Sequence, residues 1–275
     1  MKINFIFYVN QKKFLEHYLY PCIQSIFDIY NKNCEIYVAY SNCSPDILKN
    51  ISNIHLISVN NNNKNPAAKI NSGWLPILGK IKNNENIAFL DADTILIKDI
   101  SHFFENDFDI AYTYYSNHHT PYGDQSFTCS GYNRINTGVM LAKKNKRLTN
   151  FFNNYSKTVL NFFKNGSPLK NEFMAIDQDA LMWELISQNR NNLKDFQHTS
   201  RHVSDALVRP FTCAELNDPE SRPVIDETHI IHYKSGWRAI IPNGNWESVS
   251  HSPRKKENSL EQYLIWKEKY DKWNQ

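Results

Sequence analysis

The sequence predicts a Rossmann-like α/β protein in which helices flank a mixed, mostly parallel sheet. Short apolar runs alternate with segments of helical periodicity through the first half of the chain, as they do in βαβ units. The clearest of these runs, Asn86–Leu90, leads straight into a pair of aspartates. The chain has 275 residues, of which 41% are hydrophobic and 21% charged, and this suits one large globular domain.

The expected elements follow from the spacing of apolar residues. Strands are expected at Ile3–Val9, Glu35–Tyr40, His55–Val59, Asn86–Leu90, Asp109–Tyr112, Ile135–Leu141 and Thr228–Tyr233. Helices are expected at Leu15–Tyr30 with a kink or start at Pro21, at Ala67–Leu78, at Leu148–Phe162, from near Asp177, and over residues 259–273. Gly166 is expected to end its helix in a left-handed conformation. Nothing resembles a linker, so we expect one domain over residues 1–245 with a C-terminal helical extension over residues 246–275.

Charge and cysteine usage argue against several classes of protein. The net charge of +3 is small and the basic residues are scattered, so we expect no nucleic-acid partner. The five cysteines are odd in number and lack a Cys-x-x-Cys spacing, which is typical of buried thiols in a reducing compartment. No apolar run approaches the roughly 20 residues that a membrane span needs, and the polar start does not resemble a signal peptide. We therefore expect a cytoplasmic protein.

Asp91 and Asp93 directly follow the predicted strand Asn86–Leu90. Residues two apart in an extended chain point to the same side, so the two carboxylates are expected to lie close together, at the edge where open α/β sheets bind ligands. Carboxylates held this close repel each other unless a cation or a proton lies between them. A divalent metal that also binds a diphosphate would relieve the repulsion. The plain alternative is a turn with two solvated aspartates.

A phosphatase of the haloacid dehalogenase type also carries an Asp-x-Asp pair after a strand. In such a phosphatase the first Asp is a nucleophile near the N-terminus, and a later Asp pair completes a magnesium site. Here about 90 residues of βαβ pattern precede Asp91, and no later Asp-Asp pair follows. Gly-x-Ser-x-Gly, P-loop and paired-cysteine zinc patterns are absent as well, which argues against hydrolase, kinase and zinc-module functions.

Four short motifs follow one another along the chain. They are Phe89-Leu90-Asp91-Ala92-Asp93-Thr94, Ile135-Asn136-Thr137-Gly138-Val139, Asp177-Gln178-Asp179 and His232-Tyr233-Lys234-Ser235-Gly236-Trp237. Together they resemble the family 8 glycosyltransferases, the group of glycogenin and the bacterial lipopolysaccharide galactosyl- and glucosyltransferases. The resemblance spans roughly residues 1–240. It implies a GT-A fold and a metal-dependent transfer of a sugar from a UDP-sugar to a glycan or lipid-linked glycan.

The resemblance also implies a metal site and a donor site. Asp91, Asp93 and His232 would bind the metal, and an imidazole among oxygen ligands suits Mn²⁺ better than Mg²⁺. A histidine packed in a strand is the alternative for His232. The implied donor-binding residues are Tyr8, Asn10, Lys69, Asp91, Ala92, Asn136, Gly138, Lys234, Gly236 and Arg238.

Within the donor site the resemblance assigns separate roles. Tyr8 and Asn10 end the first strand, where such enzymes seat the uracil, although a core tyrosine is the alternative for Tyr8. Asn136 and Asp177 would hold the hydroxyl groups of the donor sugar. Gly138 would let that sugar lie close to the backbone.

The basic residues of the donor site follow the family pattern less closely. The family usually ends in His-x-x-Gly-x-x-Lys-Pro-Trp, whereas the motif that begins at His232 here is shorter and continues to Arg238. Arg238 or Lys234 would then replace the phosphate-binding lysine, since a guanidinium grips diphosphate oxygens in a bidentate way. Lys69 resembles the family's basic residue near the donor, with a solvated helix lysine as the alternative.

Asp177, Gln178 and Asp179 lie at the reacting carbon by the same resemblance. Asp177 is expected to cap a helix, whose N-terminus would keep these carboxylates ionised with pKa values near or below roughly 4. Charged carboxylates and the Gln178 amide oxygen would stabilise a developing oxocarbenium ion, and the departing diphosphate would take the acceptor proton, so retention of configuration is expected. Two alternatives stay open. One is an inverting GT-A enzyme with Asp179 or Glu184 as the base, and the other is a catalytically silent protein that binds the nucleotide or the sugar.

Two features lie outside these motifs. An aromatic stripe on the C-terminal helix consists of Tyr263, Trp266, Tyr270 and Trp273, with Lys267, Lys269 and Lys272 among its neighbours. Such a helix either packs on the catalytic domain or lies on the inner face of an anionic membrane, where lipid-linked acceptors are found. His198 and His202 are four apart, a spacing that can bind metal on a helix, but no carboxylate accompanies them and a surface role is expected.

Overall fold

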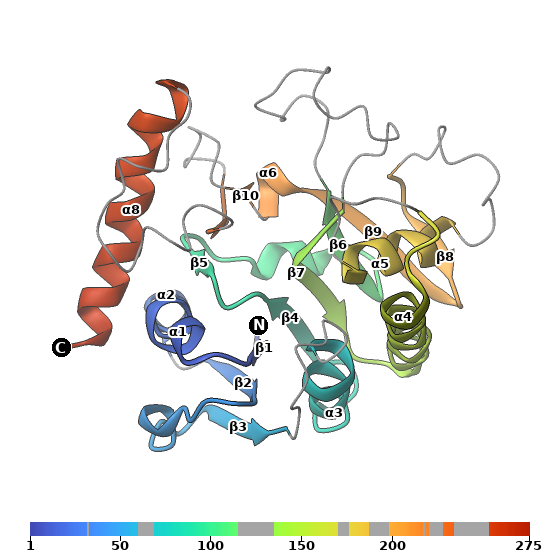
Figure 1. Cartoon of the computed structure of the whole chain (residues 1–275), viewed down its shortest axis with the longest axis horizontal. Coiled ribbons are helices and arrows are strands. Elements are labelled where there is room, and N and C mark those ends of the chain that lie inside the picture. The colour runs from blue at the N-terminus through green and yellow to red at the C-terminus, as the bar shows by residue number, and fades with distance from the viewer. Residues whose placement is uncertain are drawn as a thin grey trace.

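The computed structural model describes residues 1–31, 33–59, 69–114, 135–169, 176–186, 198–216, 218–219, 228–233 and 253–275. Within these residues an eight-stranded sheet runs through the protein and helices cover both of its faces (Figure 1). Its strands are β1 (Ile3–Val9), β2 (Cys34–Tyr40), β3 (Ile54–Ser58), β4 (Asn86–Leu90), β6 (Ile110–Tyr114), β7 (Ile135–Lys143), β8 (Arg201–Val203) and β9 (Ala206–Thr212). Their order in the sheet is β3-β2-β1-β4-β7-β6-β9-β8.

The sheet is parallel in its first half and mixed in its second. β3, β2, β1 and β4 run parallel to one another. β7 lies antiparallel to both β4 and β6, β6 pairs parallel with β9, and β8 pairs antiparallel with β9. The predicted fold class, a mixed and mostly parallel sheet flanked by helices, is therefore confirmed.

A smaller sheet of three strands lies beside the large one. In the described part of the chain its order is β10-β11-β5, with β5 at Thr94–Leu96, β10 at Asp218–Pro219 and β11 at Ile230–His232. β11 was predicted, although with longer bounds. β5 was not predicted, because three residues are too few to display an apolar period.

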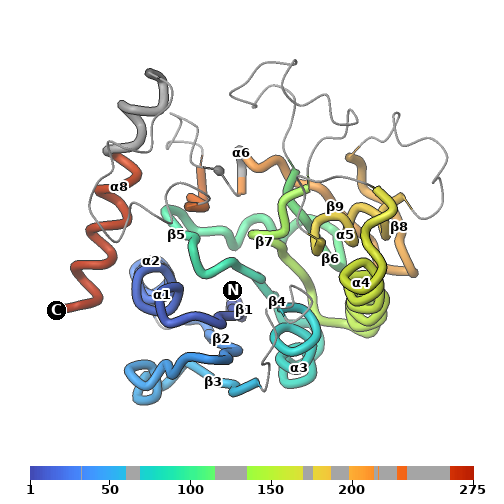
Figure 2. Tube along the Cα trace, in the orientation of Figure 1, coloured from blue at the N-terminus to red at the C-terminus, as the bar shows by residue number. Residues whose placement is uncertain are grey.

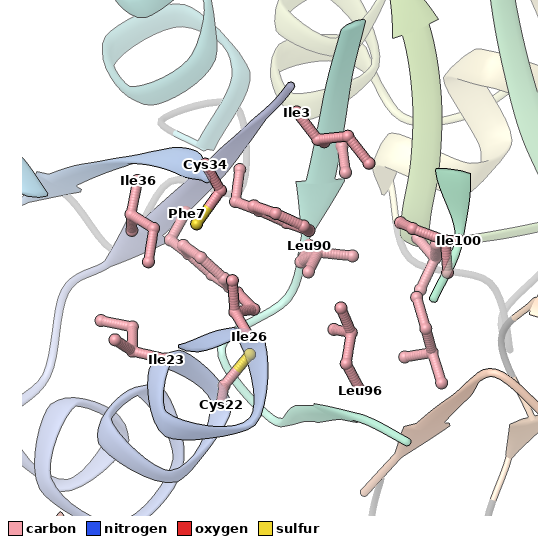
Figure 3. Packing of buried hydrophobic residues seen from close by; sticks show 14 of the residues in the cluster. Ile3, Phe7, Cys22, Ile23, Ile26, Cys34, Ile36, Leu90, Leu96 and Ile100 are labelled. Carbon is pink, nitrogen blue, oxygen red and sulfur yellow. The ribbon is translucent and has the colours of Figure 1, made fainter. Parts of the chain in front are cut away.

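The alternation of side chains along β1 divides the interior into two cores. The odd-numbered residues of β1 face one side and pack against α2 (Tyr20–Tyr30), while Ile6 faces the other side. Figure 3 shows the first core, in which Phe7 of β1 lies near Ile23 and Ile26 of α2. The second core lies between the sheet and the helices α3 (Leu75–Leu78), α4 (Lys146–Asn165) and α5 (Ile176–Ile186).

Helix α4 has clear sequence signals at both ends. Asn145 caps its first turn, since its side-chain oxygen accepts a hydrogen bond from the Leu148 N–H over 2.8 Å. The helix ends at Asn165, and Gly166 follows with a φ of +82° and a ψ of 156°. The predicted positive φ of Gly166 is confirmed, but its ψ lies outside the left-handed helical region. Short turns at Asp46–Leu48 and Ser101–Glu105, and the one-turn α6 (Cys213–Leu216), complete this part of the chain.

The first helical segment is interrupted by π-helical geometry. It consists of α1 (Lys12–Phe14), a π-helical turn at Leu15–Leu19, and α2. Pro21 has no N–H, so the carbonyl of His17, four residues earlier, receives no helical hydrogen bond from it. The indole N–H of Trp266 donates to this carbonyl over 2.8 Å. Pro21 thereby leaves an acceptor to which the C-terminal helix attaches.

The C-terminal helix α8 (Pro253–Trp273) lies beside α2 (Figure 1, Figure 2). Its aromatic stripe faces the protein: Trp266 is 4% exposed, and the Trp273 ring stacks on Tyr20 with centroids 5.1 Å apart. Lys269 donates a hydrogen bond to Asp28 over 2.8 Å. These contacts support the packing alternative for α8, and contact with a membrane stays a prediction. No helix in the described ranges combines the length and apolar character needed to cross a bilayer.

Candidate active site

The two aspartates lie at the carboxyl end of β4. The Asp91 N–H donates to the Gly138 carbonyl over 2.8 Å, which extends the pairing of β4 with β7 by one residue. The Thr94 hydroxyl donates to the Asp91 carbonyl over 2.9 Å, and the chain then continues into β5. Because β4 lies between β1 and β7, this turn is at the centre of the sheet edge.

The small sheet brings His232 to the same turn. β11 pairs antiparallel with β5, and His232 lies opposite Thr94. Nε2 of His232 lies 3.2 Å from Oδ1 of Asp93 and 3.6 Å from Oδ2 of Asp91. One ligand atom from each of these three residues lies within 4.8 Å of the other two. Two carboxylates and an imidazole at this separation fit a divalent metal such as Mn²⁺.

Gly138 of β7 leaves the space that the His232 ring fills. A Cβ atom at Gly138 would lie 1.9 Å from Cε1 and 2.4 Å from Nδ1 of His232. Both distances are far below the roughly 3.5 Å at which carbon atoms rest against each other. The imidazole is therefore a sufficient reason for glycine here, whether or not a donor sugar also approaches the backbone.

Lys69 lies on the other side of Asp91. Its ammonium is 2.5 Å from Oδ1 of Asp91, 3.7 Å from Oδ2 of Asp177 and 4.6 Å from the centre of the Trp74 ring. Burial opposes the charge of the ammonium, but the two carboxylates outweigh burial and raise the pKa of Lys69. The Lys69 side chain is 17% exposed, so the alternative of a solvated lysine is wrong.

Helix α5 holds Asp177 beside Lys69. The helix begins at Ile176, so Asp177 lies within the first turn and the predicted N-cap is wrong. The Thr137 hydroxyl donates to Oδ2 of Asp177 over 2.7 Å, and the Tyr155 hydroxyl donates to the Asp177 carbonyl over 2.8 Å. The carboxylate and the backbone of Asp177 are thus both fixed by buried hydroxyl groups.

Asp179 lies in a drier environment than the sequence suggested. It is 2% exposed, and among the described residues its Oδ1 has no hydrogen-bond partner. Burial raises the pKa of Asp179 to about 6, against a hydrogen bond from Ser167 that lowers it. The predicted pKa near or below roughly 4 is wrong for Asp179, because loss of hydration outweighs the helix dipole. The Gln178 side chain between the two aspartates is half-buried.

A cleft opens next to the aspartates. Its lining residues are Tyr8, Val9, Asn10, Phe14, Lys69, Asp91, Ala92 and Asp93. The cleft therefore brings together five of the predicted donor-binding residues, namely Tyr8, Asn10, Lys69, Asp91 and Ala92. The Tyr8 ring is half-buried, and its hydroxyl shares a hydrogen bond with the Ser41 hydroxyl over 3.2 Å.

The remaining predicted donor-binding residues are not among those that line this cleft in the described part of the chain. Asn136 is fully buried, and its side-chain oxygen accepts a hydrogen bond from the Gly138 N–H over 2.9 Å. Lys234, Gly236 and Arg238 lie outside the described residues. Contact of these residues with a donor stays a prediction.

Three residues that contact Lys69 or Asp177 were missed in the sequence, in addition to Val9 and Phe14 of the cleft wall. The three are Trp74, Thr137 and Tyr155. Thr137 stands inside one of the four motifs and offered a signal, whereas Trp74 and Tyr155 read as ordinary core aromatics.

The two discounted histidines do not share a site. Nδ1 of His198 lies 2.8 Å from the Tyr112 hydroxyl, and the His198 ring stacks on Tyr114 with centroids 4.1 Å apart. His202 is exposed. His202 therefore lies at the surface as expected, whereas His198 packs against two tyrosine rings.

Three solved glycosyltransferase structures are similar to this fold. The glycosyltransferase GlyE of Streptococcus pneumoniae TIGR4 is similar with a TM-score of 0.57 and 14% identity, over 98% of this chain and 62% of the GlyE chain. The galactosyltransferase LgtC, in complex with donor and acceptor sugar analogs, is similar with a TM-score of 0.55 and 13% identity, over 98% of this chain and 96% of LgtC. The bifunctional glycosyltransferase WbbM is similar with a TM-score of 0.50 and 11% identity, over 94% of this chain and 51% of WbbM.

These similarities establish the fold. No family model and no curated protein matches the sequence. The chain spans less than two thirds of GlyE and about half of WbbM, and nearly all of LgtC. The chain has the GT-A fold of these glycosyltransferases, so the predicted resemblance is confirmed at the level of the fold.

Proposed function

We propose that the protein is a glycosyltransferase that moves a sugar from a UDP-sugar to a glycan or lipid-linked glycan. The observation that carries this proposal is the group Asp91, Asp93 and His232 at the carboxyl end of the central strand of a GT-A fold. A divalent cation bound there would neutralise the diphosphate of the departing nucleotide. Mn²⁺ is the proposed ion, with Mg²⁺ as the second choice, because an imidazole is among the ligands.

The cleft supports a nucleotide-sugar as the donor. Tyr8 and Asn10 line its wall at the end of β1, where an aromatic ring and an amide suit the stacking and hydrogen bonding of a uracil. Lys69 brings a fixed positive charge to the same cleft. Asp177 is held beside Lys69 by the Thr137 hydroxyl, in a position from which a carboxylate would hold hydroxyl groups of the sugar.

Retention of configuration is the proposed outcome of the reaction. Asp177 and Gln178 would stabilise positive charge on the reacting carbon, and the departing diphosphate would take the acceptor proton. One LgtC structure carries a glutamine-to-glutamate substitution in its active site, and Gln178 is a glutamine beside the proposed reacting carbon of this chain. No dedicated base is needed in this mechanism.

An inverting reaction is the second candidate, and one observation favours it. Asp179 is buried and has a pKa of about 6, so this carboxylate is poised to accept a proton near neutral pH. A base must lie within hydrogen-bond reach of the acceptor hydroxyl, on the face opposite the leaving group. Proton NMR of the fresh product from an α-linked UDP-sugar separates the two: an α-linked product supports retention, and a β-linked product supports inversion with Asp179 or Glu184 as the base.

A catalytically silent binding protein is the alternative from another class. It would bind a nucleotide-sugar without Mn²⁺-dependent release of the nucleotide.

We further propose residues 1–245 as the catalytic domain, residues 246–275 as its C-terminal extension, and the cytoplasm as the location of the protein. Within the described residues Cys22, Cys34 and Cys43 are free thiols.

The test is a panel of nucleotide-sugars screened for Mn²⁺-dependent thermal stabilisation and nucleotide release. Asp91→Ala, Asp93→Ala and His232→Ala should each lower nucleotide release at least about 100-fold, since a metal supplies several kcal/mol of charge stabilisation. Asp107→Ala is the matched control, because Asp107 is an exposed aspartate, and it should keep full activity. Full activity of His232→Ala under limiting Mn²⁺ would remove His232 from the site. Absence of release from every donor would favour the silent binding protein.

A further inference from the structure

Tyr233 connects the metal ligands to the C-terminal helix. It directly follows His232, and its N–H donates to the Asp93 carbonyl over 2.8 Å. Its side chain is fully buried, and the phenol hydroxyl donates to the backbone carbonyl of Gln262 in α8 over 2.6 Å. One residue is thus bonded at its backbone to a proposed metal ligand and at its side chain to α8.

The backbone bond of Tyr233 fixes two ligands relative to each other. The pairing of β11 with β5 ends at His232 and Thr94, and the Tyr233–Asp93 bond extends it by one residue. Asp93 and His232 therefore lie on one hydrogen-bonded ladder. A shift of Tyr233 along or away from β5 would change the separation between the carboxylate and the imidazole, which is now 3.2 Å.

The side chain of Tyr233 belongs to a small core of its own. Five buried residues form this core, and they come from the π-helical turn, from strands β5 and β11, from the residue after β11 and from α8: Tyr18, Ile95, Ile231, Tyr233 and Trp266. α8 is also held by the Trp266 bond to the His17 carbonyl and, outside this core, by the ion pair of Lys269 with Asp28. The position of Tyr233 is therefore set by how α8 docks.

We propose that Tyr233 is a positioning residue through which the docking of α8 sets the affinity of Asp91, Asp93 and His232 for a divalent metal. This rests on the proposed metal site and adds a regulatory link to it. Coupling between two equilibria is reciprocal, so a bound metal stabilises the docked helix by the same factor. α8 is then part of the metal site in energetic terms, although it supplies no ligand.

The test compares Mn²⁺ binding to two tyrosine variants of the full chain. Tyr233→Phe removes the hydrogen bond from the hydroxyl group to α8. The Mn²⁺ affinity should then fall about tenfold, as it does when other residues that orient metal ligands are substituted. Electron paramagnetic resonance with and without UDP measures this affinity. Tyr30→Phe is the matched control, because this tyrosine is also buried and its hydroxyl donates over 2.6 Å to Asp99, away from the ligands. It should leave Mn²⁺ affinity unchanged.

Hydrogen exchange separates positioning from a merely structural role. In the wild-type protein Mn²⁺ should slow amide exchange over residues 261–273, and in Tyr233→Phe this protection should be lost. A Tyr233→Phe protein that is less stable but binds Mn²⁺ normally would overturn the proposal. If Tyr233→Phe does not fold, Asp28→Asn loosens α8 from outside the site. It should weaken Mn²⁺ binding in the same direction, and unchanged binding would overturn the proposal.

The same data distinguish this proposal from the proposed function. Mn²⁺ binding that depends on Tyr233, without transfer from any nucleotide-sugar, would reject the function and keep the link. If the wild-type protein is an active transferase and Tyr233→Phe leaves the Mn²⁺ affinity unaltered, the proposed function is kept and the link is rejected. A wild-type protein that binds no Mn²⁺, with or without UDP, would overturn the link.

Discussion

Substitution of Gly138 by alanine gives a sharp test of the site, because the added methyl group meets the His232 ring. The new Cβ would lie 1.9 Å from Cε1 of His232, whereas carbon atoms rest about 3.5 Å apart. The difference of roughly 1.6 Å must be taken up by the ring or by β7. His232 is 1% exposed, and β7 is bonded to β4 and β6, so neither moves without loss.

Two consequences of Gly138→Ala are expected. Overpacking of this kind costs about 1–3 kcal/mol, which urea unfolding without metal would measure. A displacement of more than about 1 Å in a catalytic group costs about 100-fold in rate. We therefore expect a destabilised protein whose Mn²⁺-dependent nucleotide release falls at least about 100-fold.

Two further variants control for the substitution itself. Gly79→Ala adds the same methyl group where the nearest atom is the Pro76 carbonyl oxygen at 3.4 Å and the φ of −65° suits alanine, so stability and activity should hold. In Gly138→Ala/His232→Ala the clash with the imidazole is removed, and the added Cβ keeps only the tight contact with Oδ1 of Asn136 at 3.1 Å. Most of the lost stability should therefore return, without activity. Normal Mn²⁺ affinity and turnover in Gly138→Ala would refute this reasoning, as would a double variant that is no more stable than the single one.

Two other predictions concern stability. Asp109 is 2% exposed and accepts hydrogen bonds from Arg147, Asn145 and the Leu207 N–H. Asp109→Asn should therefore cost about 2–4 kcal/mol in urea unfolding, somewhat below the usual range for a buried pair because the Arg147 side chain is exposed. A loss below about 0.5 kcal/mol would show that these bonds are redundant. Asp179 has a folded pKa of about 6, above the unfolded value of about 3.9, so the folded state binds more protons between these values and stability should fall as pH rises from about 4 to about 6. Without metal, this pH dependence amounts to a change of up to about 3 kcal/mol in the free energy of unfolding, and Asp179→Asn should abolish it. A variant whose stability changes between pH 4 and pH 7 as the wild-type stability does would contradict the assigned pKa.

The parts of the site that lie on one strand end could be predicted from the sequence. Asp91 and Asp93 follow a strand whose apolar run is unmistakable, and this local pattern fixes where their carboxylates lie. His232 depended on the family resemblance, because its partner strand β5 has only three residues. The order of the four motifs along the chain therefore pointed to His232, which the apolar periodicity did not.

The parts that depend on long-range packing could not be predicted. Gly138 contacts His232 only because β7 pairs antiparallel with β4 while β11 pairs with β5. The raised pKa of Asp179 depends on how deeply α5 is buried, and the position of a helix start in the sequence does not report this. The π-helical turns at Leu15–Leu19 and Lys69–Trp74 are each followed by an α-helix with a proline at its second residue. The spacing of apolar residues predicts an ordinary α-helix for both turns.

The attachment of α8 has a consequence for the order in which the protein becomes complete during synthesis. The hydrogen bond that attaches α8 joins Trp266 to His17, which are 249 positions apart. α8 also follows every described strand of both sheets in the sequence. Contacts between distant positions form late, since the intervening chain must exist before they close. Strands β1 to β9 can pair as the ribosome delivers them, but the Tyr233 hydroxyl cannot donate to the Gln262 carbonyl until residue 262 has emerged. A nascent chain therefore acquires its sheet first, and the support for its proposed metal ligands forms only after α8 has emerged.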